Sequence, residues 1–395
     1  MKRLIGYTAV LCLLALTVGC GGTTSTGTLA YVSNSTGSGF TVFNVNTDGT
    51  LSTSSISPQN TPASPKVLQF SPDGRWAFFL DTAGTSVYAY TRSGNGSLAA
   101  LAYILPLTSP ASSLAVSTNS QFLYVALPAA QPLPQLAVIS INQSYGGLVQ
   151  IQTLNSSYSI SQLVMAPDGV LYGLAPAAVL SFTLAPSTGF ATGPNTFFVG
   201  SDLSYMVLST NGSYLYVLDH QDTAPYPNPG TGGTGPSPSI YAFTTASTGI
   251  LLTIPNSPFH ENPYQLSPYP FPSNPIGGAT SSDSRFLYIA NLGSGNGGFV
   301  SVFSISATAG LLGQLTEVIG QPTFVNGVAV SSTASPYPCG CSPTFLAVAR
   351  ANNGLYLLSP TAIFQFAIQQ NTGVLRAFQP ASVPVSNNPT WITIR

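Results

Sequence analysis

The only two histidines of this chain each lie beside a carboxylate, in two long insertions. His220 follows Asp219 with Asp222 close behind, and His260 precedes Glu261. A histidine within reach of a carboxylate can act as a general base and activate water for attack on a carbonyl carbon. The sequence therefore predicts His220, His260, Asp219 and Glu261 as candidate catalytic residues.

A structural role is the alternative for the same residues. The two insertions, 219–239 and 253–275, are rich in proline, glycine and tyrosine, as surface loops often are. A histidine in such a loop often hydrogen-bonds its own backbone. Tyr226, Tyr264 and Tyr269 could form an aromatic platform for a sugar ring or a partner loop, and Tyr264 is a candidate ligand contact.

The composition points to β structure. Hydrophobic residues make up 44% of the chain and charged residues only 5%, so the surface must be polar through serine, threonine, asparagine and glutamine. No run of good helix formers is long enough for an amphipathic helix. The net charge of -1 gives no basic footprint, which argues against a nucleic-acid partner.

The N-terminus has the features of an export signal. Three residues with two positive charges precede an uncharged stretch, 4–18, that is too short to span a bilayer comfortably. The segment LTVGC resembles the lipobox of bacterial lipoproteins, which implies a signal peptide over 1–19, lipid on Cys20 and a tether over 20–27. An ordinary secretory peptide is the alternative. Gly21 favours the outer membrane, by resemblance to enteric lipoprotein sorting, so we expect a lipid-anchored protein of the cell envelope.

Two further cysteines, Cys339 and Cys341, remain in the exported part. Their spacing allows a small disulfide in an oxidising compartment, two free thiols, or half of a metal site. A local disulfide is favoured over zinc, because no histidine or second cysteine pair lies nearby in the sequence. We predict no metal site and no cofactor.

Internal repeats organise the rest of the chain. An apolar segment with the pattern of a strand recurs seven times, at 28–34, 75–81, 121–127, 169–175, 213–219, 285–291 and 344–350. After each comes an alternating strand closed by a glycine turn, with the glycines at 49, 96, 146, 189, 249, 310 and 373. This spacing is typical of a four-stranded propeller blade. The sequence predicts an all-β fold: one seven-bladed propeller over 28–395, whose antiparallel blades are closed by pairing NPTWITIR with the N-terminal strand.

The predicted topology selects a second group of candidates. Connections after the second and fourth strands of every blade share one face, where small ligands usually bind in this architecture. Polar residues predicted at the end of a second strand, together with Lys66 before an inner strand, are candidate ligand contacts: Asn34, Asp81, Asp219, Asn291 and Arg350. Capping of loop backbone is their alternative role. At two equivalent positions the chain has Leu127 and Ala175, so the predicted mouth is depleted in polar groups.

The repeat also carries a family resemblance. S-P-D-G-R, followed by an F/L-L-Y-V-x-N-like strand, V-x-x-F and T-G-x-L, resembles the lactonase family of seven-bladed propellers, best known for hydrolysis of 6-phosphogluconolactone. The resemblance implies a site at the mouth of the central channel. An exported lipoprotein would not meet that cytosolic substrate, and few arginines or lysines are predicted there to hold a phosphate. We therefore expect a monomeric binding or interaction module for a glycan, small ligand or protein. Lactone hydrolysis is the alternative.

Overall fold

The computed structural model describes residues 27–227, 234–260, 274–293, 297–318, 322–325, 328–332, 335–386 and 388–395, with side chains outside 221–237 and 322–332. The predicted signal peptide, Cys20, Glu261, Tyr264 and Tyr269 lie outside these residues. In this part of the chain the regular elements are β-strands. It contains no helix that is long and apolar enough to cross a membrane.

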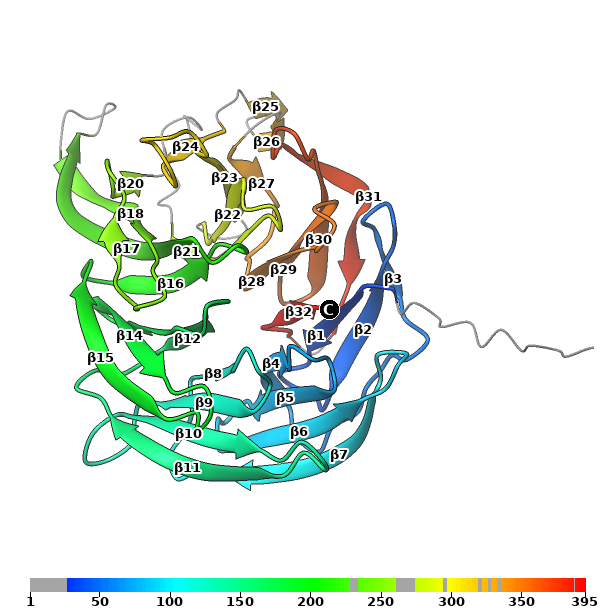
Figure 1. Cartoon of the computed structure of the whole chain (residues 1–395). Coiled ribbons are helices and arrows are strands. Elements are labelled where there is room, and N and C mark those ends of the chain that lie inside the picture. The colour runs from blue at the N-terminus through cyan, green and yellow to red at the C-terminus, as the bar shows by residue number, and fades with distance from the viewer. Residues whose placement is uncertain are drawn as a thin grey trace, which may run out of the picture.

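Seven antiparallel blades form a closed ring (Figure 1), which confirms the predicted propeller. We number the blades along the chain and give their strands from the centre outward. Blade 1 has β32 (Ile392–Ile394), β1 (Leu29–Ser33), β2 (Phe40–Val45) and β3 (Leu51–Thr53). Blade 2 has β4 (Pro65–Phe70), β5 (Trp76–Asp81), β6 (Ser86–Arg92) and β7 (Leu98–Pro106). Blade 3 has β8 (Ser113–Val116), β9 (Phe122–Leu127), β10 (Gln135–Ile141) and β11 (Leu148–Asn155).

The remaining blades follow the same order. Blade 4 has β12 (Gln162–Met165), β13 (Leu171–Ala175), β14 (Ala178–Leu184) and β15 (Ala191–Phe198). Blade 5 has β16 (Leu203–Leu208), β17 (Tyr214–Pro227), β18 (Thr234–Thr244) and β19 (Leu252–Thr253), with β20 (Phe259–His260) also paired to β18. Blade 6 has β21 (Pro275–Thr280), β22 (Phe286–Asn291), β23 (Phe299–Ile305) and β24 (Leu315–Glu317), with β27 (Tyr337–Pro338) on β23. Blade 7 has β28 (Phe345–Val348), β29 (Gly354–Leu358), β30 (Ala362–Ile368) and β31 (Leu375–Pro384), and β25 (Pro322–Val325) and β26 (Val328–Ser332) form a separate hairpin.

The two ends of the chain close the ring as predicted. The C-terminal strand β32 pairs with the N-terminal strand β1, with Ala30 opposite Ile394 and Val32 opposite Ile392. β32 is the innermost strand of blade 1, so both ends of the chain build one blade. This pairing leaves the ring without a free strand edge where it begins and ends.

A tyrosine and a glycine explain why both repeats recur along the chain. The third residue of β9, Tyr124, donates from its buried hydroxyl to the carbonyl of Gly189 in the next blade, at 3.0 Å. Gly189 has a φ of 73°, a left-handed conformation that glycine adopts without strain. The same bond joins three other pairs of neighbouring blades, through Tyr31 and Gly96, Tyr216 and Gly313, and Tyr356 and Gly49. In these four pairs of blades, the second strand of one blade is thus bonded to a turn of the next, whereas the hydroxyls of Tyr172 and Tyr288 have no partner among the described residues.

Two details differ from the sequence predictions. Segment 344–350 contains the innermost strand β28, not a second strand, and the second strand of blade 7 is β29. Inner and second strands have similar apolar patterns, so in blade 7 only Tyr356 identifies β29 as the second strand. Arg350 therefore lies in the turn between β28 and β29, on the face opposite the one we predicted. The insertion 219–239 is also not an irregular loop, because β17 and β18 extend through much of it as a long hairpin.

Candidate functional site

Two faces of the ring must be distinguished before the site is described. Strands alternate in direction, so connections after the second and fourth strands emerge on one face, which we call the mouth face. Turns after the first and third strands emerge on the other, which we call the turn face. Of the predicted catalytic residues, Asp219, His220 and His260 lie on the mouth face of blade 5, and Arg350 lies on the turn face.

Asp219 caps a loop. The residue is fully buried. Its Oδ2 accepts a hydrogen bond from the backbone N–H of Ser201 at 2.9 Å, and its Oδ1 accepts one from the N–H of Asp202 at 3.2 Å. Both oxygens therefore hold the connection between blade 4 and blade 5. This arrangement matches the capping role rather than that of a general base open to a substrate.

His220 bridges two blades. Its Nε2 lies 3.0 Å from the carbonyl oxygen of Pro275, at the start of β21, and must donate a proton there. Its Nδ1 lies 3.5 Å from Oδ2 of Asp202, and 32% of the side chain is exposed. Asp202 is the carboxylate partner that sequence reasoning missed, because it lies in a different connection. When the ring is doubly protonated, it pairs with Asp202 and with the carbonyl at once.

His260 has different neighbours. Its Nδ1 lies 3.2 Å from the hydroxyl of the buried Ser239, which is opposite it on β18. Ser239 in turn lies opposite Asp219 on β17, so two strand spacings, about 10 Å, separate Asp219 from His260. The two histidines share blade 5 and one face, as predicted. No contact joins their rings within the described side chains.

The other predicted ligand contacts at the ends of second strands are hydrogen-bonded within their own blades. Asp81 accepts from the Thr85 hydroxyl at 2.7 Å and from the N–H of Ser86 at 3.1 Å. Asn34 and Asn291 are buried. The side-chain oxygen of Asn34 accepts from the Thr41 hydroxyl, and the side-chain amide of Asn291 donates to the Ser301 hydroxyl. Their side chains are thus committed to their own blades.

Lys66 is a different case. It occupies an irregular position in the pairing of β4 with β5, between Pro65 and Val67, and is half-buried. Its ammonium group makes no ion pair within the part of the chain that the structure describes. Lys66 therefore remains a candidate ligand contact on the mouth face.

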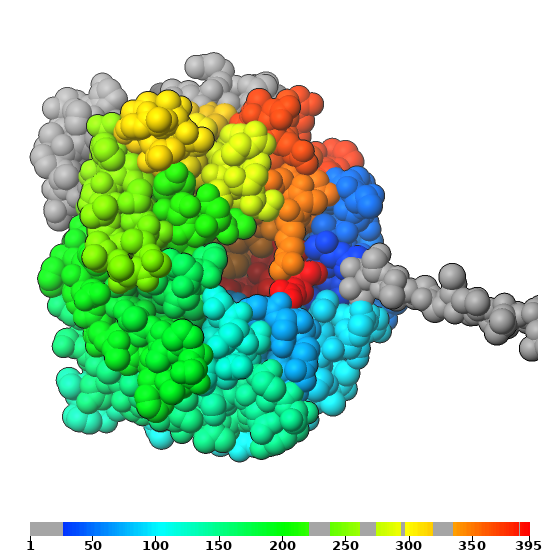
Figure 2. Space-filling view, viewed as in Figure 1, coloured from blue at the N-terminus to red at the C-terminus, as the bar shows by residue number. Residues whose placement is uncertain are grey.

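The centre of the ring holds a cavity that the sequence did not reveal. Its volume is about 650 Å³, and Figure 2 shows the ring hollowed at its centre. The lining comes from the inner strands β4, β8, β12, β16 and β21 together with Trp391. It runs from Ser112 and Ser161 at the mouth-face ends of these strands to Pro167 and Thr210 at the turn-face ends. None of the described lining residues carries a charge.

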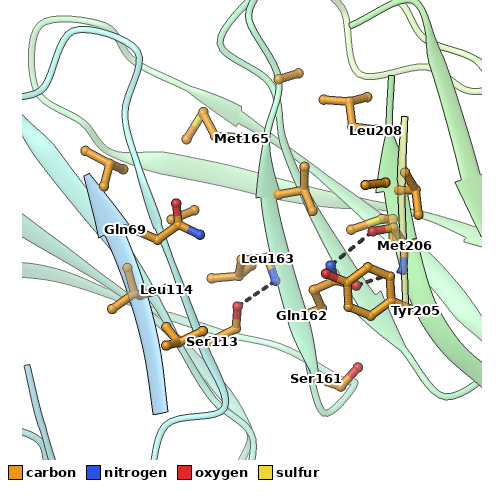
Figure 3. Close-up of a pocket in the computed structure, with 18 of the residues that line it drawn as sticks. Gln69, Ser113, Leu114, Ser161, Gln162, Leu163, Met165, Tyr205, Met206 and Leu208 are labelled. Carbon is orange, nitrogen blue, oxygen red and sulfur yellow. Dashed lines mark hydrogen bonds between the residues drawn. The ribbon is translucent and has the colours of Figure 1, made fainter. Parts of the chain in front are cut away.

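Several polar groups of this cavity tie neighbouring blades together (Figure 3). The hydroxyl of Ser113 accepts from the N–H of Leu163 at 3.0 Å. The amide of Gln162 donates to the carbonyl of Met206 at 3.0 Å and accepts from its N–H at 2.8 Å. These contacts hold β8, β12 and β16 side by side.

Two other polar side chains of the lining, Gln69 on β4 and Tyr205 on β16, are not tied in this way. No hydrogen bond occupies the Gln69 amide or the Tyr205 hydroxyl within the described residues. Burial raises the pKa of Tyr205, so its hydroxyl stays protonated and can donate. The two side chains come from blades 2 and 5, so they offer donors and acceptors from different sides of the cavity.

An aromatic cluster lies at the mouth-face end of the cavity. The Tyr205 ring is 6.0 Å from Phe345, which is 4.2 Å from Trp391, measured between ring centroids. The three come from blades 5, 7 and 1. Three aromatic rings therefore meet where the inner strands begin.

The disulfide and the metal site were two further questions from the sequence. Cys339 and Cys341 form a disulfide on the mouth face, with Cα atoms 5.2 Å apart. Their loop exchanges backbone hydrogen bonds with Gly298, so it is fastened to blade 6. No group of three histidine, cysteine or acidic side chains that could hold a metal occurs in the described residues.

Solved structures with the same fold include proteins that are named as lactonases. No protein-family model and no curated protein matches the sequence. A candidate 6-phosphogluconolactonase from Bacteroides uniformis has the same fold, with a TM-score of 0.71, 15% identity and coverage of 93% of this chain and 99% of its own. The Pseudomonas aeruginosa periplasmic gluconolactonase gives a TM-score of 0.66, with 17% identity and coverage of 93% and 98%.

Hydrazine synthase from Kuenenia stuttgartiensis also matches, with a TM-score of 0.57, 13% identity and coverage of 91% and 92%. Its name denotes a chemistry unrelated to lactones. At these identities the likeness establishes the fold, and function must come from the site.

Proposed function

We propose that this chain is a lactonase-like propeller that works as a binding module, and that its central cavity takes an uncharged, hydroxyl-rich ligand such as a sugar. This proposal rests on the cavity of about 650 Å³, because none of its described lining residues carries a charge. Its volume falls within the range of pockets that bind small molecules. A cavity without ionic groups has no means of holding a carboxylate or a phosphate strongly.

The free groups of the cavity suit a polyol. The Gln69 amide offers two donors and a carbonyl acceptor, and the Tyr205 hydroxyl offers one donor and an acceptor. The C–H face of a sugar ring can pack against the rings of Trp391 and Tyr205. A ligand held in this way gains orientation from hydrogen bonds at opposite sides and contact area from the aromatic end.

Location completes the proposal. The features of residues 1–20 support export and lipid attachment at Cys20, and Gly21 favours the outer membrane. The disulfide between Cys339 and Cys341 suits an oxidising compartment outside the cytoplasm. We therefore propose a monomeric, lipid-anchored protein of the cell envelope that meets extracytoplasmic sugars.

Calorimetric titration of the full chain with neutral sugars, sugar acids and sugar phosphates tests the binding function. Neutral ligands should bind, and Gln69→Ala and Tyr205→Phe should each weaken binding by about tenfold, the effect of one lost hydrogen bond of about 1.4 kcal/mol. Tyr145→Phe is the matched control, because Tyr145 is 61% exposed and lies outside the cavity. Binding of sugar acids or sugar phosphates that Gln69→Ala and Tyr205→Phe weaken as much as they weaken binding of neutral sugars, or equal effects of all three substitutions, would refute the proposal.

Lactone hydrolysis is the second candidate, and the pairing of His220 with Asp202 favours it. If a substrate displaced the Pro275 carbonyl and the ring proton moved to Nδ1, facing Asp202, the free Nε2 could take a proton from water. The assay is turnover of phosphorylated and unphosphorylated aldonolactones by the full chain. Turnover that His220→Ala abolishes and His260→Ala preserves would support an enzyme. No turnover across the panel would reject it.

A further inference from the structure

Three arginines gather on the turn face, away from the mouth of the ring. Arg395 follows the inner strand β32, and Arg350 follows the neighbouring inner strand β28, so both lie where these strands end. Arg92 ends β6 of blade 2, and its guanidinium carbon lies 5.6 Å from the centre of the Phe70 ring, at the end of β4. We call Arg92, Arg350 and Arg395 the arginine cluster.

Local contacts hold two of the three guanidinium groups. Nη2 of Arg395 donates to the carbonyl of Pro72 at 3.0 Å. Arg92 reaches the hydroxyl of Tyr31, while its Nε is buried and has no hydrogen-bond partner within the described residues. A Cβ built on Gly96 would lie 2.9 Å from the Tyr31 hydroxyl and 3.5 Å from Nη2 of Arg92. The Arg92 head is thus fixed in place and still lacks one acceptor.

The cluster has no carboxylate bonded to it. Among the described residues, the ion pairs are Asp202 with His220 and Asp283 with Arg285, and neither involves the cluster. Burial and the charges of Arg350 and Arg92 lower the pKa of Arg395, whereas Asp73 acts in the opposite sense. The Asp73 carboxylate already accepts from the Ser71 hydroxyl and the Arg75 N–H. Three like charges therefore lie close together, with Asp73 as the nearby acidic side chain.

The turn face as a whole carries more positive than negative side chains. The turns and strand ends of this face hold six arginines, which include Arg75, Arg285 and Arg376, against the aspartates at 48, 73, 168 and 283. Among the described side chains at the ends of second strands and in the connections of the mouth face, Lys66 stands against Asp81, Asp202 and Asp219. An anion approaching the protein is therefore drawn to the turn face.

We propose that the arginine cluster binds a phosphate-type oxyanion. Guanidinium groups present paired N–H donors that match the oxygens of a phosphate. A bound oxyanion offsets the mutual repulsion of the three charges. The site lies on the turn face, where Phe70 and Pro72, which contact Arg92 and Arg395, also line that end of the cavity. Its proposed ligand is separate from the sugar.

The position of the chain's entry suggests where the phosphate comes from. Leu29 exchanges backbone hydrogen bonds with Arg395, so the chain enters the propeller beside the cluster. Eight residues separate the predicted lipid-bearing Cys20 from Leu29, and they span at most about 29 Å when extended. A lipid on Cys20 would thus hold this face toward a bilayer, where phospholipid headgroups carry phosphate. Free phosphate is the other source of the same chemistry.

Arg350→Gln and Arg376→Gln form a matched pair for the test. Both arginines are exposed, both lie on the turn face, and both substitutions remove one positive charge, but only Arg350 belongs to the cluster. In calorimetric titration of the full chain with inorganic phosphate at constant ionic strength, Arg350→Gln should weaken binding about tenfold. Arg376→Gln should change it less than about twofold. Equal effects, or no phosphate binding, would overturn the site.

Vesicles separate the two sources. The full chain is sedimented with phosphatidylglycerol vesicles and with phosphatidylcholine vesicles, with and without inorganic phosphate. Stronger binding to phosphatidylglycerol that phosphate and Arg350→Gln both reduce assigns the site to a lipid headgroup. Phosphate binding in solution without this lipid preference assigns it to a free anion. Loss of both signals in Arg376→Gln as well as Arg350→Gln would show a diffuse charge effect and overturn the site.

Discussion

The hydroxyl of Tyr124 gives a sharp test of how the blades are held together. Tyr124 and Tyr172 occupy the same position in blades 3 and 4, and both are fully buried. The Tyr124 hydroxyl donates to the Gly189 carbonyl at 3.0 Å, whereas the Tyr172 hydroxyl has no partner among the described residues. Replacing each by phenylalanine removes the same oxygen from two different environments.

The expected free energies have opposite signs. Tyr124→Phe loses a bond between blades and leaves a buried carbonyl unpaired, which should cost about 1–2 kcal/mol of the free energy of unfolding. Tyr172→Phe removes a buried hydroxyl that was never paired, so it should leave stability unchanged or raise it by up to about 1 kcal/mol. Burial raises the pKa of Tyr172 to about 12 and that of Tyr124 further, so neither ionises near neutral pH.

Guanidinium unfolding of the full chain, followed by tryptophan fluorescence, measures both variants. The midpoint should fall for Tyr124→Phe and stay or rise for Tyr172→Phe. Equal losses in both variants would show that the hydroxyl bond is not what distinguishes the two blades, and the account of the tyrosine repeat would fail.

Other predictions concern the carboxylates. Asp219→Ala should lower the free energy of unfolding by about 3 kcal/mol, because it leaves the N–H groups that the carboxylate binds unpaired. Asp81→Ala, at a half-buried cap, should lower it by less than half as much. Equal losses in the two variants would contradict the capping argument. For Asp283, burial raises the pKa, but bonds from Ser281 and Arg285 outweigh it and hold the pKa below its usual 3.8. Its contribution to stability is therefore present above about pH 4 and is lost as pH falls through the folded-state pKa. Asp283→Asn should flatten this acid limb in melting curves between about pH 5 and about pH 2, and an unchanged limb would contradict it.

The fold could be predicted because each blade carries two visible signals. Most second strands carry a tyrosine, and in four pairs of neighbouring blades it bonds a glycine carbonyl of the next blade, so the period appears twice in the sequence. The register of blade 7 could not be predicted in the same way. β28 and the second strands are alike in their apolar pattern, and the true second strand is recognised only by Tyr356.

The site was harder to predict for physical reasons. A carboxylate at the end of a strand can face a ligand or cap a loop, and the residue type is the same in both cases. For Asp219, only the positions of the Ser201 and Asp202 N–H groups decide between them. The cavity has no local motif, because each inner strand contributes only a few residues and its volume depends on the radius of the ring. Roles for Cys20, Glu261 and Tyr264 remain predictions.

The central claim is that a neutral, hydroxyl-rich ligand enters the cavity, and tryptophan emission tests it most directly. The chain has two tryptophans, of which Trp391 lines the cavity and Trp76 is buried between blades 2 and 3. Titration with neutral sugars should change the tryptophan emission of the full chain, and the change should level off as the cavity fills. Trp391→Phe should abolish that change. Emission that no neutral sugar alters, or a change that persists in Trp391→Phe, would contradict the claim.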